Sequence, residues 1–168
     1  MIMENRNLIR FDWAMKRLLR NKASYSVLEG FLSELLKEDV EIQSMLESES
    51  NKQYENDKYN RVDMLVKNST GELIIIEIQN QSEYDFFHRM AYGTSKVLTE
   101  YISVGEPYSA IKKVYSVNVV YFDLGQGQDY VYHGKTDFFG IHNSDKLQLS
   151  EKQKELLGKI EPFQIFPE

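Results

Sequence analysis

The pattern of apolar and polar residues predicts a β-hairpin between Asn60 and Gln79. Two strand-like segments, 60–67 and 72–79, flank the turn-rich tetrapeptide Asn-Ser-Thr-Gly. Turn residues of this kind between two such segments are typical of a short hairpin loop. The second segment contains Leu-Ile-Ile-Ile-Glu-Ile-Gln, which predicts a strand buried on both faces. Glu77 is the one acid in it, and a buried carboxylate without a partner is unfavourable by several kcal/mol or requires a shifted pKa.

Helical periodicity occurs on both sides of this hairpin. We expect a short helix over 11–19 and a second helix from a cap at Ser24 or Ser26 to about Glu38. A long helix is expected over 83–103. The apolar stripe of the second helix consists of Val27, Leu28, Phe31, Leu32, Leu35 and Leu36. The inward residues of the long helix are expected to be Phe86, Phe87, Met90, Thr94, Val97, Leu98 and Tyr101.

The remaining segments add strands and a last helix. Residues 40–49 partly alternate and form either a strand or a helical turn. Residues 114–124 predict a strong strand, and Gly-Gln-Gly-Gln-Asp then predicts a hairpin turn into a shorter strand over 130–133. A helix is expected over 150–159. The order of elements predicts an α/β fold with a mixed β-sheet flanked by helices, in a single domain spanning 1–168.

Composition excludes several classes of protein. The 168 residues are 42% hydrophobic and 12% aromatic, which fits a soluble globular domain. No cysteine is present, so disulfides and thiolate metal sites are excluded. No apolar segment approaches the roughly 18–20 residues that a membrane span needs. We therefore expect no membrane association and, by default, a cytoplasmic location.

The charge is unevenly distributed along the chain. The net charge is −6, yet residues 1–22 carry six basic and two acidic residues, a local balance of 6 − 2 = +4. The remainder therefore sums to −6 − 4 = −10. This asymmetry indicates either an anionic partner at the N-terminal end, with Lys16 and Arg17 as contacts, or an ordinary solvated helix face.

The register of the hairpin decides whether Glu77 has an acidic neighbour. If the loop is 69–71, the numbers of paired residues sum to 140, and Asp63 lies opposite Glu77 with Cβ atoms about 4.5–5.5 Å apart. A two-residue loop would put them on opposite faces. Two carboxylates that close share either a proton or a cation, and Mg²⁺ prefers oxygen ligands. Gln79 shares the face of Glu77 and would orient a water or bind phosphate. Alternatively, each acid pairs with a nearby Lys or Arg.

Several segments together resemble a known family. An Asp, a hairpin and apolar residues leading into Glu-x-Gln resemble the PD-(D/E)XK nuclease motif, with Asp63, Glu77 and Gln79 in its places. The segments FDWAMKRLL, NRVDMLV, IIEIQ, FFHRMAYGTSK and VVYFDLGQGQDYVYHG with GIH resemble the Rpn family of recombination-promoting nucleases and transposases. They span about 11–142, in the family's order.

The resemblance implies a restriction-endonuclease-like fold and Mg²⁺-dependent cleavage of DNA, with Mn²⁺ as a substitute, in a role tied to recombination or mobile DNA in bacteria. Asp63 and Glu77 would be the metal ligands. Gln79 stands where the superfamily more often has lysine, so it lacks the positive charge that lysine gives to the transition state. The alternative is a degenerate nuclease fold that binds DNA or a protein partner without cleaving.

The superfamily often adds an acid from its first core helix. Glu29 and Glu34 are the candidates, and we prefer Glu29; the alternative is a solvated glutamate. Members of the family also tend to run longer at the C-terminal end, so this chain is either a natural short form or a shortened one. Many nucleases pair two active sites to cut both strands, which would make the protein a homodimer.

The long helix offers a second candidate DNA contact. Arg89, Tyr92 and Lys96 are spaced i, i+3 and i+7 and so share a helix face. Beside a metal site, this face would hold a phosphate backbone. Alternatively, Arg89 neutralises Asp85 or Glu77, and Tyr92 belongs to the core.

Overall fold

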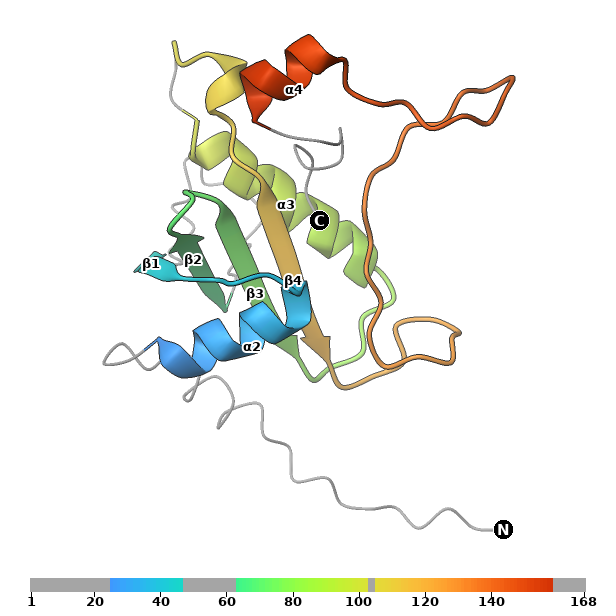
Figure 1. The fold of residues 1–168 in the computed structure, drawn as a ribbon. Coiled ribbons are helices and arrows are strands. Elements are labelled where there is room, and N and C mark those ends of the chain that lie inside the picture. The colour runs from blue at the N-terminus through green and yellow to red at the C-terminus, as the bar shows by residue number, and fades with distance from the viewer. Residues whose placement is uncertain (1–24, 47–62, 103–104, 159–168) are drawn as a thin grey trace.

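The computed structural model describes residues 25–46, 63–102 and 105–158. The helix expected over 11–19, the candidate cap Ser24 and the candidate DNA contacts Lys16 and Arg17 lie outside the described residues. The elements in chain order are α2 (Ser26–Leu36), β1 (Ile42–Leu46), β2 (Met64–Asn68), β3 (Leu73–Gln79), α3 (Phe86–Glu100), the 3₁₀ turn η1 (Tyr108–Ala110), β4 (Val114–Val120) and α4 (Glu151–Leu157), as Figure 1 shows.

Four strands form one mixed sheet in the order β1-β2-β3-β4. β1 and β2 are antiparallel, as are β2 and β3, whereas β3 and β4 are parallel. Parallel neighbours need a long crossover, and α3 supplies it between β3 and β4. The expected mixed sheet flanked by helices is confirmed, and residues 42–46 are a strand rather than a helical turn.

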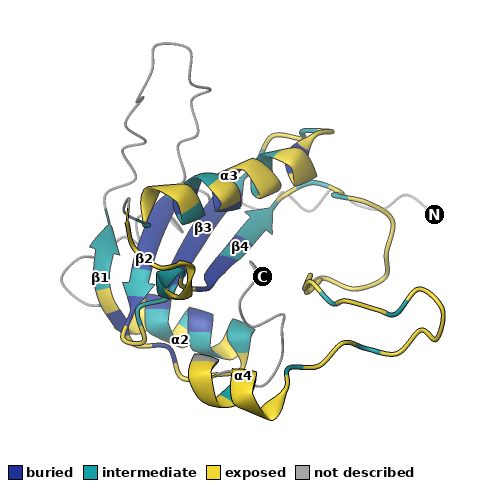
Figure 2. Cartoon of the chain, turned by 90° about the horizontal axis from the view of Figure 1, so that it is seen from above, coloured by how far each residue is buried: buried dark blue, intermediate teal, exposed yellow. Residues whose placement is uncertain are grey.

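Helices α2 and α3 cover opposite faces of the sheet, with the buried strands between them (Figure 2). Side chains alternate along β3, so Ile74, Ile76 and Ile78 share one face and pack in the cluster that contains Leu28 and Leu32 of α2. Ile75 lies on the other face, in the cluster with Val97 of α3. Glu77 is in phase with Ile75 and therefore lies on the α3 side.

The β2–β3 hairpin has the three-residue loop that brings both acids to one end of the sheet. The paired residues include Met64 with Ile76 and Lys67 with Leu73, so the numbers sum to 140 as expected. The loop is closed by Asn68 N, which donates to Glu72 O at 3.0 Å. Gly71 completes the turn with φ +84°, a left-handed conformation that glycine adopts without steric penalty.

Gly71→Ala is expected to lower the free energy of unfolding by about 1 kcal/mol, because a Cβ is unfavourable at positive φ. The added methyl group would meet only ordinary contacts, Lys112 Cε at 3.7 Å and Lys67 Cε at 3.8 Å, so the backbone conformation accounts for the effect. Urea denaturation measures it. Gly30→Ala in α2, where a Cβ meets nothing within 4 Å, is the control and should stabilise by about 0.5–1 kcal/mol. Equal effects of the same sign would contradict the turn argument.

Some predicted inward residues are exposed. Val27 on α2 is 47% exposed, and on the α3 side Phe87 is 60% and Tyr101 46% exposed. Phe86 takes the buried position at the start of α3, where its ring meets Phe122 edge to face at 5.7 Å between centroids. Adjacent helical residues point about 100° apart, so Phe87 turns toward solvent when Phe86 packs inward.

The start of α2 has no side-chain cap, whereas both ends of α4 are capped. Ser26 is not a cap: it is the first residue of α2, and the N-cap is Tyr25, with no side-chain capping bond. Ser150 caps α4 through a capping box with Gln153, and α4 ends at Gly158 in the left-handed conformation. The helix expected over 150–159 is therefore confirmed.

The predicted strand over 130–133 is wrong. β4 ends at Val120, and no strand is described at 130–133, so the preceding Gly-Gln-Gly-Gln-Asp segment is not a hairpin turn. Tyr130 is fully exposed, and none of the four strands of the described sheet pairs with this segment. Farther along, Lys146 Nζ lies 3.0 Å from Asp137 Oδ1, and this contact lowers the pKa of the Asp137 carboxyl group.

Candidate active site

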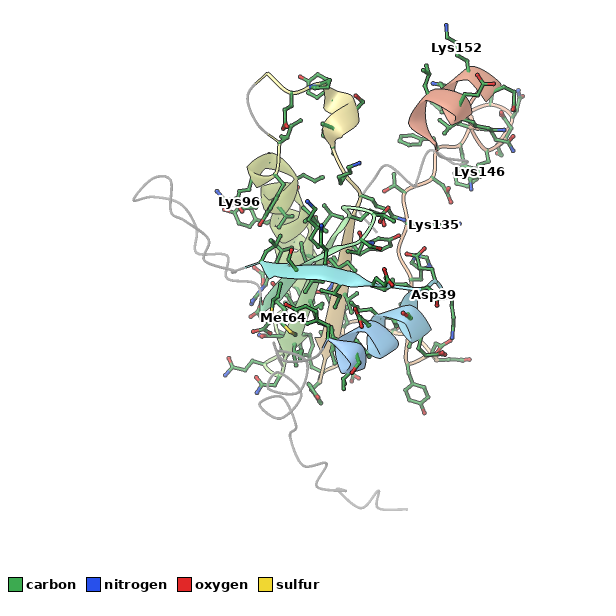
Figure 3. The ribbon with its side chains drawn as sticks, turned by 60° about the vertical axis from the view of Figure 1, so that its left-hand side comes forward. Asp39, Met64, Lys96, Lys135, Lys146 and Lys152 are labelled. Atoms are coloured by element: carbon green, nitrogen blue, oxygen red, sulfur yellow. The ribbon has the colours of Figure 1, made fainter. Side chains whose placement is uncertain are left out.

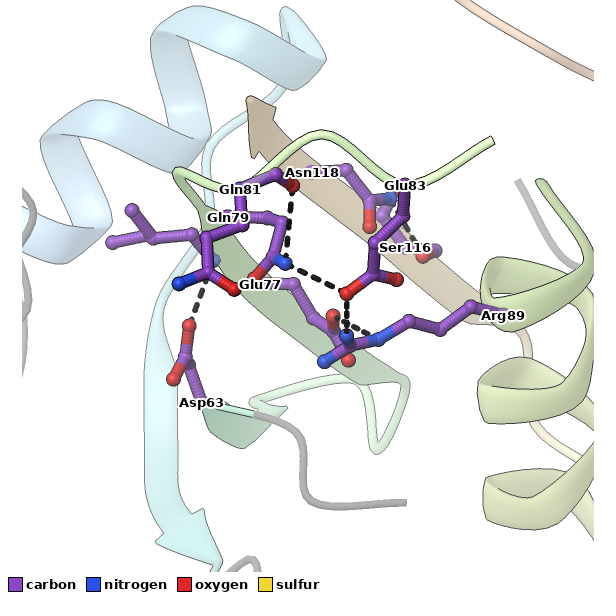
Figure 4. Close-up of polar contacts among 9 residues, drawn as sticks. Asp63, Glu77, Gln79, Gln81, Glu83, Arg89, Ser116 and Asn118 are labelled. Atoms are coloured by element: carbon purple, nitrogen blue, oxygen red, sulfur yellow. Dashed lines mark hydrogen bonds and ion pairs between the residues drawn. The ribbon is translucent and has the colours of Figure 1, made fainter. Parts of the chain in front are cut away.

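Asp63 lies one residue before β2, where backbone pairing with β3 ends. The ladder ends at Met64, one residue after Asp63, so Asp63 continues the register by position only. Its carboxylate is held by the neighbouring strand, because Ile78 N donates to Asp63 Oδ2 at 2.8 Å. This bond fixes Asp63 at the end of the hairpin that also carries Glu77 and Gln79 (Figure 4).

Glu77 is a buried carboxylate with a cationic partner. The residue is 7% exposed, and Arg89 Nε of α3 lies 3.3 Å from Glu77 Oε2. A buried acid requires a positive or hydrogen-bonding neighbour to offset the loss of water. Of the alternatives open from the sequence, the contact between Arg89 and Glu77 is therefore the one found.

Glu83 links the end of β3 to α3, and sequence reasoning missed it. Arg89 Nη1 donates to Glu83 Oε1 at 2.9 Å, so the guanidinium bridges two carboxylates. Gln79 Nε2 donates to the same oxygen at 2.8 Å and to Gln81 O at 3.2 Å. Figure 4 shows this network at the end of β3. The sequence signal that could have indicated Glu83 is an acid four positions after Gln79, in the short connection between β3 and α3.

β4 adds two polar residues, Ser116 and Asn118, next to the strand that carries Glu77. In the parallel register, Ser116 lies beside Ile75 and Asn118 beside Glu77. Asn118 Nδ2 donates to Ser116 O at 3.0 Å and to Ser116 Oγ at 2.9 Å. The face that carries the acids thus changes from apolar to polar toward the carboxyl ends of β3 and β4.

The structure does not bring Glu29 together with Asp63 and Glu77. Glu29 lies on α2, and its Oε1 accepts a hydrogen bond from Ile42 N at 2.9 Å. Ile42 pairs with Asn68, which is five positions from Asp63, or about 17 Å along an extended strand. Glu29 therefore ties α2 to β1 near the hairpin loop. The other candidate, Glu34, forms an exposed ion pair with Lys37.

The candidate DNA-binding face of α3 is only partly turned to solvent. Arg89 is directed to Glu77 and Glu83, whereas Tyr92 is 38% exposed. Lys96 Nζ lies 3.6 Å from Glu100 Oε1, farther along α3 and away from Met64, the neighbour of Asp63 (Figure 3). Of the three predicted residues on this face, Arg89 therefore contacts Glu77 and Glu83, and Lys96 lies farther along the helix.

The donor chemistry of this site fits a hard divalent cation. Asp63 and Glu77 offer carboxylate oxygens, the ligands that Mg²⁺ prefers, although Arg89 Nε already lies 3.3 Å from Glu77 Oε2. Within residues 25–46, 63–102 and 105–158, no group of three or more His, Cys, Asp or Glu side chains is placed to hold a metal. A cation bound by the two acids would thus take its remaining ligands from water, substrate or an amide oxygen.

Comparison with known proteins identifies the family. No curated protein and no solved structure matches the chain. In the part of the chain that the structure describes, no helix is long and apolar enough to cross a membrane. Residues 9–154 match the sequence profile described as PD-(D/E)XK nuclease family transposase, a range that contains Asp63, Glu77 and Gln79. The chain therefore belongs to the PD-(D/E)XK nuclease family transposases.

Proposed function

We propose that the protein is a metal-dependent DNA endonuclease that hydrolyses phosphodiester bonds, in a role connected with recombination or mobile DNA. The observation that carries the proposal is that Asp63, just before β2, and Glu77, on β3 two residues before Gln79, lie at the same end of the β2–β3 hairpin. Family membership supports a nuclease-type function on DNA.

Each residue of the site has a role in this proposal. Asp63 and Glu77 would hold Mg²⁺ or Mn²⁺, which when bound polarises a phosphodiester oxygen and lowers the pKa of a bound water. Ile78 N keeps Asp63 oriented, and Arg89 keeps the buried Glu77 carboxylate in position. Gln79 places the attacking water through a hydrogen bond.

DNA would approach along α3, where Tyr92 and Lys96 contact the phosphate backbone. A net charge of −6 makes such local contacts more important than overall attraction. Two copies of the chain would place one site on each strand, which favours a homodimer as the cleaving species. We place the reaction in the cytoplasm.

A second candidate is a nuclease fold that binds DNA without cleaving it. Two observations favour this candidate: Gln79 carries no positive charge, and Arg89 already pairs with one of the proposed metal ligands. Arg89 would then serve as a permanent substitute for the cation.

Nicking of supercoiled plasmid in Mg²⁺ or Mn²⁺ tests the proposal. The full chain should convert supercoiled to open-circular DNA. EDTA should stop the reaction, because without a bound cation the two carboxylates can neither activate a water nor stabilise the negative charge of the transition state. Gel electrophoresis measures the conversion. DNA binding without cleavage, measured by fluorescence anisotropy of a labelled duplex, would select the second candidate. Cleavage that persists in EDTA would overturn the metal mechanism.

A further inference from the structure

We infer that Glu83 is a positioning residue that fixes the amide group of Gln79, so that Gln79 serves the site through its carbonyl oxygen. This inference rests on the proposed function and concerns the position where the superfamily more often has lysine. The carbonyl oxygen of Gln79 would then either bind the metal ion or accept a hydrogen bond from a water. It would not replace the cationic donor that a lysine supplies.

The orientation of the Gln79 amide follows from the chemistry of its two partners. Glu83 Oε1 and Gln81 O lie 2.8 and 3.2 Å from Gln79 Nε2, and both are acceptors only. A flipped amide would place Oε1 against these two oxygens, with no proton between them. Both N–H groups of Gln79 are therefore used, and Oε1 is the atom that these contacts leave for a ligand.

Glu83 is itself held from a second element. Arg89 Nη1 of α3 lies 2.9 Å from the same Glu83 Oε1, so donors from β3 and α3 converge on one oxygen. The side chain of Glu83 is only 30% exposed. This arrangement fixes the carboxylate, and through it the amide of Gln79, on the same strand face as Glu77.

The consequence is an oxygen-rich site. Gln79 is two residues after Glu77 on β3, and Asp63 is hydrogen-bonded to Ile78 between them. Two carboxylates and an amide oxygen are ligands that suit Mg²⁺ and Mn²⁺. With both N–H groups engaged by Glu83 and Gln81, Gln79 cannot also donate to a phosphate oxygen.

Binding of Mn²⁺ to the full chain without DNA, measured by electron paramagnetic resonance, tests this inference independently of cleavage. Glu83→Ala should weaken Mn²⁺ binding about 10–100-fold, the range for loss of an outer-shell partner. Glu83→Gln retains an oxygen that accepts from Gln79, so it should keep Mn²⁺ affinity within about threefold of wild type. Glu34→Ala, which removes an exposed acid on α2, is the control and should leave binding unchanged.

Comparing Glu83→Ala with Glu83→Gln separates the hydrogen bond that Glu83 accepts from Gln79 from the negative charge of Glu83. If Glu83→Gln weakens Mn²⁺ binding as much as Glu83→Ala, the charge of Glu83 and not its hydrogen bond is responsible, and the inference is overturned. Gln79→Lys should also weaken binding at least about tenfold, since an ammonium group would replace an oxygen donor. Unchanged affinity in Gln79→Lys would overturn the inference while leaving the proposed function intact. No Mn²⁺ binding by the wild-type chain would overturn both.

Discussion

Asp63→Asn is expected to slow metal-dependent plasmid nicking by more than about 100-fold while the fold is retained. Loss of a residue that only positions a metal ligand lowers metal affinity or activity about 10–100-fold, and loss of a direct ligand should lower it more. The substitution removes the negative charge but keeps an oxygen that can accept the hydrogen bond from Ile78 N, which is 2.8 Å long in the wild type. Initial rates of nicking at saturating Mg²⁺ and at a series of concentrations measure the effect.

Asp129→Asn provides a matched control for Asp63→Asn. Asp129 is exposed, and its Oδ1 also accepts a backbone hydrogen bond, from Tyr130 N at 2.7 Å. It lies outside the sheet that carries the site, so its loss of charge should leave nicking unchanged. If Asp63→Asn cleaves at the wild-type rate, Asp63 is not a ligand, and its bond to Ile78 is structural.

The hairpin was predictable from the turn residues before Leu73, which lie between two strand-like segments. The register was not: a shift by one residue moves every side chain to the other face, but β3 is apolar on both faces, so burial alone did not choose between a two-residue and a three-residue loop. The structure confirms the pairing of Met64 with Ile76. That register places Asp63 and Glu77 at the same end of the sheet.

The network around Glu83 was not predictable from the pattern. Glu83 lies in the connection between β3 and α3, where no periodicity fixes the direction of a side chain. The sequence suggested Glu77 as one partner of Arg89. The second contact, with Glu83, depends on how α3 packs on the sheet. The strand predicted over 130–133 failed for a related reason, because a strand needs a partner edge that local sequence does not specify.

Arg89→Met is expected to lower the free energy of unfolding by about 2 kcal/mol in the absence of metal. Breaking a fully buried ion pair by removing one partner costs about 3–5 kcal/mol, and solvent screening reduces this figure because the Arg89 side chain is 33% exposed. For a chain of 168 residues the loss corresponds to a fall in Tm of about 4–8 °C, which differential scanning calorimetry measures.

The origin of this effect is the charge of Glu77, which is 7% exposed and would remain buried beside a neutral side chain. Glu77→Gln in the Arg89→Met background should therefore recover most of the lost stability, and Mn²⁺ should raise the Tm of Arg89→Met more than that of wild type. Lys96→Met, on the same helix but paired with Glu100, should cost at most about 1 kcal/mol. A Tm of Arg89→Met equal to that of wild type without metal would show that Arg89 is not the counter-cation of Glu77. If Mn²⁺ restores the Tm of Arg89→Met toward that of wild type, the guanidinium and the metal stabilise the same carboxylate, that of Glu77.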